Sequence, residues 1–230
     1  MGTIILIRHA RSVANVENVL AGQTPGVRLD AHGVEQSKNL AEILGSAPVT
    51  KVIVSPLERC LATISPWIDR YGHGVEIESD PRIIEPDYGT WSGRKLDELS
   101  LEPLWRDVQQ NPESVTFPHG ERFIDVWHRV QNFYRSLEHN IASAADNSVN
   151  ILVVSHGDII KFLIANVLKM EFKNFQSLIV EPSSISIAQI TKDGARLMEY
   201  NRSHQSISEL ISKNLVATLG GETPSNRRAE

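Results

Sequence analysis

The stretch Ile4–Ser12, which reads IILIRHARS, decides how the rest of the chain is interpreted. Its four apolar residues are followed directly by Arg8 and His9. A short continuous apolar run is typical of a central strand that is covered on both faces. Such a strand would carry a cation and an imidazole side by side at its carboxyl end. This combination indicates a polar site at one edge of a sheet.

Similar apolar strand patterns alternate with amphipathic helical patterns along the chain, which favours an α/β layered fold. We expect three layers, with a mainly parallel central sheet and helices on both of its faces. The later strands are expected at residues 51–56, 74–79, 150–155, 184–190 and 195–200, the last two forming a hairpin around Asp193-Gly194. We expect one domain over residues 1–203, in which residues 86–122 form a cap or insertion over the site. Residues 204–230 are expected to form a C-terminal helix and tail with a disordered polar end.

The composition limits the function. The formal net charge of -5 gives no general attraction for nucleic acid or for an anionic membrane, so we expect neither as a partner. No apolar run approaches the roughly 20 residues that a membrane-spanning helix needs. The chain has one cysteine, Cys60, which fits a reducing compartment and hence a cytoplasmic protein.

Polar residues follow each predicted parallel strand, at the edge where open α/β sheets bind ligands. The first strand ends in Arg8 and His9, and the second leads through SPLER to Arg59. The third leads into RIIEPDYG with Glu85, and the fourth ends in VVSHG with His156. We therefore expect two guanidinium groups, two imidazoles and a carboxyl group to meet at one edge.

This set of groups has a chemical meaning. Two guanidinium groups can bind a phosphate dianion through forked hydrogen bonds. A neutral imidazole can attack phosphorus and form a phosphohistidine, while a second imidazole donates to the phosphoryl oxygens. A carboxyl group can protonate the leaving oxygen and later deprotonate water.

Four motifs carry a family resemblance: LIRHARSVAN (6–15), SPLERCLAT (55–63), EPDYGTWSG (85–93) and VVSHGDII (153–160). In this order they resemble the histidine phosphatase superfamily, which has the phosphoglycerate mutase-like fold, over about residues 3–202. The match is closest to the phosphatase and phosphomutase branch. The resemblance implies that His9 is the phosphorylated nucleophile, that Glu85 is the acid and base, and that Arg8, Arg59 and His156 complete the phosphate pocket. It also implies substrate or phosphate contacts by Ser12, Asn15, Ala21, Gly22, Gln23, Tyr88 and Gly157, and it implies no metal and no cofactor.

Some of these residues have simpler interpretations. Ser12, Asn15 and Gln23 could be turn or capping residues, and Asp87 lies in the same loop as Glu85. His119 and Glu121, in FPHGERF, fit either a phosphatase motif or a turn before the long helix. One residue departs from the family: Ala10 stands where a glycine is usual, and we expect that the position needs only a small side chain. Cys60 is expected to be a helix residue that packs inward. A cysteine-phosphatase mechanism is excluded, because it needs an arginine six residues after the cysteine and Pro66 stands there.

The sequence favours hydrolysis of a phosphate ester over transfer of the phosphoryl group to a second position of the substrate. Mutases of the family have a long basic insertion after the Glu loop, whereas the comparable segment here, residues 95–122, is short and acidic. We expect a metal-independent phosphomonoester hydrolase acting on a small phosphorylated metabolite. Trp105 and Phe117 could supply an apolar wall, which would make a bulky ester conceivable. The alternatives are a phosphomutase and a non-catalytic protein that binds a phosphorylated ligand. A homodimer is also possible: residues 184–190 could lie at a sheet edge and pair with a second subunit, although a protected edge fits the sequence equally well.

Overall fold

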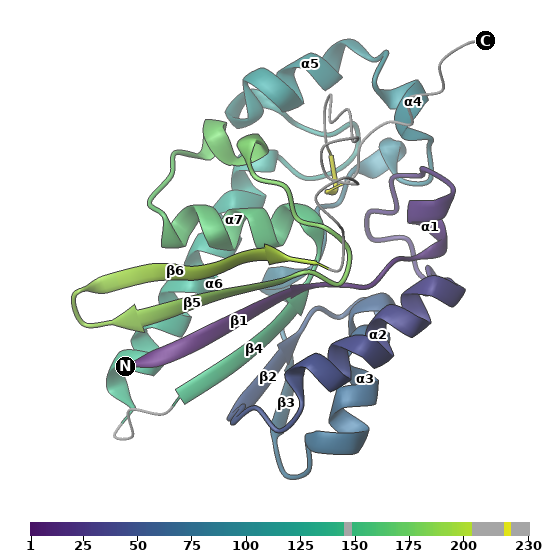
Figure 1. The fold of residues 1–230 in the computed structure, drawn as a ribbon. Helices are drawn as coiled ribbons and strands as arrows, with labels where there is room; N and C mark the ends of the chain where they lie inside the picture. The colour runs from purple at the N-terminus through teal and green to yellow at the C-terminus, as the bar shows by residue number, and fades with distance from the viewer. Residues whose placement is uncertain (145–148, 204–218, 222–230) are drawn as a thin grey trace.

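The computed structural model describes residues 1–144, 149–203 and 219–221, and its centre is a six-stranded sheet. The strand order is β3-β2-β4-β1-β5-β6 (Figure 1). The strands are β1 (Gly2–Arg8), β2 (Lys51–Val54), β3 (Glu76–Ser79), β4 (Val149–Ser155), β5 (Ile185–Thr191) and β6 (Gly194–Arg202). The other residues of the predicted C-terminal region, 204–218 and 222–230, lie outside the described part of the chain.

The sheet is mainly parallel, as the sequence predicts. Strands β3, β2, β4 and β1 run parallel to their neighbours, whereas β5 runs antiparallel to both β1 and β6. The predicted hairpin around Asp193-Gly194 is therefore confirmed. The suggestion that residues 184–190 form an edge strand is wrong, because β5 lies between β1 and β6. The two edge strands are β3 and β6, so a homodimer built by strand pairing would have to use one of them.

Helices cover both faces of the sheet, with α2 and α3 on one side and α6 and α7 on the other (Figure 1). None of the described helices combines the length and the apolar character needed to cross a bilayer. The α-helices are α1 (Val13–Val16), α2 (Ala31–Leu44), α3 (Glu58–Tyr71), α4 (Leu96–Leu99), α5 (Pro103–Gln110), α6 (Phe123–Ser143) and α7 (Gly157–Val167). Short 3₁₀ helices are η1 (Pro81–Ile83), η2 (Gly89–Trp91), η3 (Pro112–Ser114) and η4 (Phe172–Ser177).

The alternation of side chains along β1 divides the core into two parts. Ile4 and Leu6 belong to one cluster of buried residues, and Ile5 and Ile7 belong to the other. The first cluster contains residues of α6 and α7, such as Phe133 and Phe162, and the second contains residues of α2 and α3, such as Leu40 and Trp67. The strand is thus buried on both faces, which fixes the position of the residues that follow it.

The loop after β1 is fastened to the start of α2. Asp30 caps α2 by accepting from Gly33 N at 2.8 Å, and its carboxylate also binds the Arg11 guanidinium. Gly33 packs so closely that an added Cβ would lie 1.9 Å from the Arg11 carbonyl oxygen. A glycine is required here by this close approach of two backbones. The loop that follows His9 is therefore held on the helix side as well as by the strand.

Residues 86–122 contain η2, α4, α5 and η3, and their apolar side chains belong to the core of the molecule. Trp105 and Phe117 are buried in the same cluster as Trp91. The expectation that Trp105 and Phe117 form a wall for a substrate is wrong, because neither lines the pocket at the ends of the strands. Each aromatic side chain that is buried in this core removes a large apolar area from water, which stabilises the fold.

Candidate active site

The register of β1 and β4 brings His9 and His156 together. Arg8 pairs with Ser155 in this parallel ladder, so the next residue of each strand comes to the same edge. His9 N donates to the Ser155 carbonyl oxygen at 2.8 Å, and the two imidazole ring centroids are 5.3 Å apart. Two histidines separated by 147 positions, from 9 to 156, are neighbours because of strand register alone.

The end of β2 adds a hydroxyl group and a guanidinium group. Ser55 follows β2, and its Oγ lies 2.7 Å from His156 Nε2. Helix α3 begins at Glu58, which places Arg59 in its first turn. Arg59 Nη2 donates to the Gly22 carbonyl oxygen at 2.9 Å and lies 3.7 Å from Glu85 Oε2. Arg59 Nε is buried and has no hydrogen-bond partner among the described residues, so it is a donor suited to an anion.

Several hydrogen bonds hold the backbone of the Glu85 loop. Ser155 Oγ donates to the Ile83 carbonyl oxygen at 2.7 Å, and Gln23 Nε2 donates to the Glu85 carbonyl oxygen at 2.8 Å. Arg129, on α6, donates to the carbonyl oxygens of Arg82 and Glu85. These contacts fix Glu85 against β4 without using its carboxyl group. Arg129 could not be recognised from the sequence, because its position on α6 shows no motif.

The segment FPHGERF has a structural role in this arrangement. Glu121 accepts from Asp87 N at 2.8 Å and pairs with the Arg129 guanidinium at 3.2 Å. His119 is exposed and has a positive φ of 60°. Of the two interpretations of this motif, the turn before the long helix describes the contacts better. Glu121 stabilises the Glu85 loop through its contacts with Asp87 N and Arg129.

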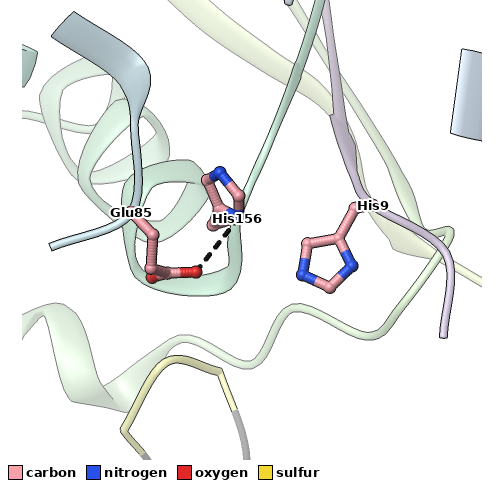
Figure 2. A group of neighbouring side chains, drawn as sticks. All are labelled: His9, Glu85 and His156. Carbon is pink, nitrogen blue, oxygen red and sulfur yellow. Dashed lines mark ion pairs between the residues drawn. The ribbon is translucent and has the colours of Figure 1, made fainter. Parts of the chain in front are cut away.

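Glu85 and the two histidines form the centre of the site (Figure 2). Glu85 Oε2 lies 3.1 Å from His156 Nδ1, the contact drawn as a dashed line, and His9 lies on the other side of His156. A small pocket opens beside His9 and Glu85. Its lining residues are His9, Ser12, Asn15, Val19, Leu20, Ala21, Gly22, Arg59, Glu85, Tyr88 and Gly220.

The hydrogen bond of His9 fixes its tautomer. His9 Nδ1 lies 2.8 Å from the carbonyl oxygen of Ala10. A carbonyl oxygen only accepts hydrogen bonds, so Nδ1 carries the ring proton and Nε2 keeps its lone pair. Burial, the nearby Arg59 guanidinium and His156 lower the pKa of His9 well below its usual value. His9 is therefore a neutral imidazole with a nucleophilic Nε2.

The pKa of Glu85 is shifted upward, in the opposite direction to that of His9. Burial is the main cause that raises the pKa of Glu85 to about 7, although Arg59 and Arg8 favour its ionised form. Burial and the same two guanidinium groups also lower the pKa of His156 well below its usual value. A carboxyl group with a pKa near neutrality can give up a proton and take it back, which suits a general acid and base.

The charges around this centre favour an anion over a metal cation. One ligand-type atom each of His9, Glu85 and His156 lies within 4.8 Å of the others, a grouping that could in principle surround a metal ion. However, the guanidinium groups of Arg8 and Arg59 are buried beside it. Two fixed cations repel a third and attract a phosphate dianion.

The predicted contact residues fall into two groups. Ser12, Asn15, Ala21, Gly22 and Tyr88 line the pocket together with His9, Arg59 and Glu85. Ser12 and Asn15 also form a capping box at the start of α1, so the structural interpretation of these two residues holds as well.

The other predicted contacts are not among the residues that line the pocket. Arg8 Nη1 donates to the carbonyl oxygens of Val180 and Gly221, at 2.7 and 3.0 Å. Gln23 binds the Glu85 backbone. His156 has its ring nitrogens next to Ser55 and Glu85. Gly157 is the first residue of α7 and is buried.

Ala10 fits its position without strain. It is fully buried, its N–H donates to Thr63 Oγ1 at 2.8 Å, and it is not among the described non-glycine residues with a positive φ. The backbone conformation at this position therefore does not require a glycine. Cys60 is buried as predicted, and its Sγ lies 3.5 Å from His156 Nε2.

The C-terminal residues Leu219–Gly221 contribute to the site, although no sequence motif indicates this. Leu219 is fully buried, Gly220 N donates to Asp158 Oδ2 at 2.8 Å, and Gly221 accepts from Arg8. They pack so closely on Gly157 that a Cβ there would lie 2.6 Å from the Gly220 carbonyl oxygen. A Gly-Gly pair in a polar tail has no periodicity, so only the folded chain reveals its place.

With this fold and this site, the chain belongs to the histidine phosphatase superfamily (branch 1), whose family model matches residues 4–203. An adenosylcobalamin/alpha-ribazole phosphatase from Salmonella typhimurium is 29% identical, over 85% of this chain and 94% of the relative. Phosphoserine phosphatase 1 from Hydrogenobacter thermophilus is 26% identical, over 87% of this chain and 92% of the relative. The crystal structure of an alpha-ribazole phosphatase from Shigella flexneri has a TM-score of 0.75 at 27% identity, covering 87% of this chain and 96% of that one.

Proposed function

We propose that this protein is a phosphomonoester hydrolase that acts through a phosphohistidine on His9. The observation that carries this proposal is the fixed tautomer of His9, whose Nε2 lone pair belongs to a pocket that also contains Arg59 and Glu85. A nucleophile, a fixed cation and a carboxyl group of raised pKa are the parts that the reaction needs.

The reaction would have two steps. In the first, His9 Nε2 attacks phosphorus, the bond from phosphorus to the ester oxygen breaks, and Glu85 gives its proton to that oxygen. In the second, the Glu85 carboxylate takes a proton from water, the hydroxide attacks phosphorus, and the phosphorus–nitrogen bond breaks. The guanidinium groups of Arg59 and Arg8 would stabilise the charge on the phosphoryl oxygens in both steps.

The substrate is proposed to be a small phosphorylated metabolite. One relative is named an adenosylcobalamin/alpha-ribazole phosphatase and another phosphoserine phosphatase 1, so both names describe phosphatases that act on phosphorylated metabolites. His9 is only 3% exposed and lines the small pocket, which favours a small substrate. We place the enzyme in the cytoplasm, because its one cysteine is unpaired and buried.

A phosphomutase is the second candidate function. One relative, 30% identical over 72% of this chain, is named a probable phosphoglycerate mutase from Proteus mirabilis. A mutase must hold a second phosphate, but the acidic residues of segment 95–122 do not favour a doubly charged substrate. Transfer of label between isomeric phosphates, faster than phosphate release, would select the mutase, and no turnover of any ester would select a binding protein.

Trapping the phosphoenzyme tests the proposed function directly. After brief incubation with ³²P-labelled phenyl phosphate and denaturation, we expect label that is released by acid and stable in base, as a phosphoramidate is. Label that is stable in acid and released by base would contradict a phosphohistidine. EDTA should leave the rate unchanged, whereas a loss of rate that a divalent cation restores would contradict the metal-independent mechanism.

The pKa of Glu85 predicts the pH dependence. Glu85 is protonated below about pH 7 and can act as an acid there, so kcat/KM for phenyl phosphate should fall as pH rises through about 7. His9 stays neutral down to a pH well below 6.5, so its protonation should reduce the rate only at more acidic pH. A phosphomonoester loses its second proton near pH 6, so the fall near pH 7 belongs to the enzyme. A rate that keeps rising through pH 8 would contradict Glu85 as the acid.

A further inference from the structure

Asp158, the second residue of α7, is fully buried beside the site and has no role in the mechanism above. Its Oδ2 accepts from Gly220 N at 2.8 Å and lies 3.1 Å from the Tyr88 hydroxyl oxygen. The same hydroxyl oxygen is 3.2 Å from Glu85 Oε1. Tyr88 therefore stands between two carboxyl groups with a single proton to donate.

The directions of the hydrogen bonds follow from the neighbours. Burial and the adjacent carboxyl groups raise the pKa of Tyr88 well above its usual value, so its hydroxyl keeps its proton. His156 is neutral, and its Nε2 faces Ser55 Oγ at 2.7 Å. If the serine hydroxyl donates to Nε2, the imidazole proton is on Nδ1 and is donated to Glu85 Oε2 at 3.1 Å (Figure 2). This arrangement leaves Oε1 as the oxygen that carries the proton of Glu85.

Protonated Glu85 then needs an acceptor at Oε1, and the Tyr88 oxygen is within reach. That oxygen can accept only if its own hydrogen points elsewhere, and Asp158 Oδ2 is the second acceptor next to it. Lys161 Nζ lies 3.3 Å from Asp158 Oδ1, which balances the charge of the buried carboxylate. The described residues thus form a directed chain from Ser55 through His156, Glu85 and Tyr88 to Asp158.

We propose that Asp158 is a positioning residue which, by accepting the Tyr88 hydroxyl proton, allows Tyr88 to accept from Glu85 and so stabilises the acid form of Glu85. When Glu85 gives its proton to the leaving oxygen, the Tyr88 hydroxyl turns and donates to the new carboxylate. Asp158 keeps Gly220 N and Lys161 as partners at that stage. The proton that moves belongs to Glu85, and Tyr88 retains its own, so one hydroxyl group serves both halves of the cycle.

Asp158→Asn tests the proposal, which rests on the proposed function. An amide lacks the negative charge and can donate to Tyr88, so the acid form of Glu85 loses support. The charged groups that also face Glu85 are Arg8 from β1, Arg59 from α3 and Arg129 from α6, and they remain unchanged. We expect the alkaline limb of kcat/KM for phenyl phosphate to move to lower pH by about 0.5 units or more.

Lys161→Met is the matched control. Like Asp158→Asn, it breaks the ion pair between Lys161 and Asp158, but it leaves the contact between Asp158 and Tyr88 intact. It should not move the limb to lower pH. Tyr88→Phe should lower kcat, and adding Asp158→Asn to it should change kcat less than twofold. An unmoved limb in Asp158→Asn, the same downward movement in Lys161→Met, or a full additional loss in the double variant would each overturn the proposal.

Two further readouts keep the test decisive. If Asp158→Asn fails to fold, as judged by circular dichroism, Tyr88→Phe decides alone, and an unchanged kcat and limb in that variant would overturn the proposal. Its ring still packs on Phe117, with centroids 4.9 Å apart, so this variant keeps the core. Failure of the proposed function is distinguishable, because the wild-type protein would then form no phosphoenzyme.

Discussion

Replacement of His9 by alanine should lower turnover of phenyl phosphate by at least about 10³-fold, because the reaction loses its nucleophile. The His9 lone pair at Nε2 is fixed by the bond from Nδ1 to the Ala10 carbonyl oxygen, and no other side chain among the described lining residues offers a neutral nitrogen nucleophile. The acid-labile ³²P label should disappear together with the turnover. Release of inorganic phosphate and recovery of labelled protein measure both effects.

Stability separates a chemical effect of His9→Ala from a structural one. The variant loses one buried hydrogen bond, worth about 1 kcal/mol, which corresponds to a fall in Tm of about 2–4 °C for a chain of this size. His128→Ala, at an exposed position on α6, is a matched control that should leave turnover and label unchanged. If His9→Ala kept a tenth of the activity or any acid-labile label, His9 would not be the nucleophile.

The fold and the centre of the site could be predicted because they follow from local patterns. The apolar runs that become β1, β2 and β4 are buried on both faces, so each shows an uninterrupted pattern. Parallel strands end at the same edge, and this rule alone is enough to group His9 with His156 from the order of residues along the chain. The side-chain chemistry then points to a phosphate ester.

The support behind these residues could not be predicted, because it depends on contacts between distant segments. Asp158 and Gly220 meet across 62 positions, and Arg8 and Gly221 meet across 213. Neither pair has a periodic pattern or a motif of its own. The sequence also does not show whether an aromatic side chain packs into the core or lines a pocket when both are close to it. For this reason the expectation that Trp105 and Phe117 line the pocket is wrong, and both lie in the core.

Replacement of Glu85 by glutamine should slow hydrolysis according to the leaving group. Phenol is a weak acid with a pKa near 10, so its departure needs a proton, and kcat for phenyl phosphate should fall by about 10²–10⁴-fold. The more acidic p-nitrophenol leaves without that help. With p-nitrophenyl phosphate the first step should stay fast, while the second step, which needs Glu85 as a base, becomes slow. Rapid mixing should therefore show a burst of one p-nitrophenol per active site, followed by slow turnover.

Accumulation of the phosphorylated enzyme distinguishes a loss of chemistry from a loss of substrate binding. A variant that merely bound substrate poorly would show no burst with p-nitrophenyl phosphate, so the absence of a burst would contradict the acid and base role of Glu85. Asp87→Asn is the matched control, since Asp87 lies two residues away in the same loop and is outside the pocket lining. It should keep turnover within about fivefold and keep the fall of rate near pH 7, which Glu85→Gln should lose. A burst in one variant and not in the other would separate the two carboxyl groups of the loop by their chemistry, because only the loss of a base in the second step traps the phosphorylated enzyme.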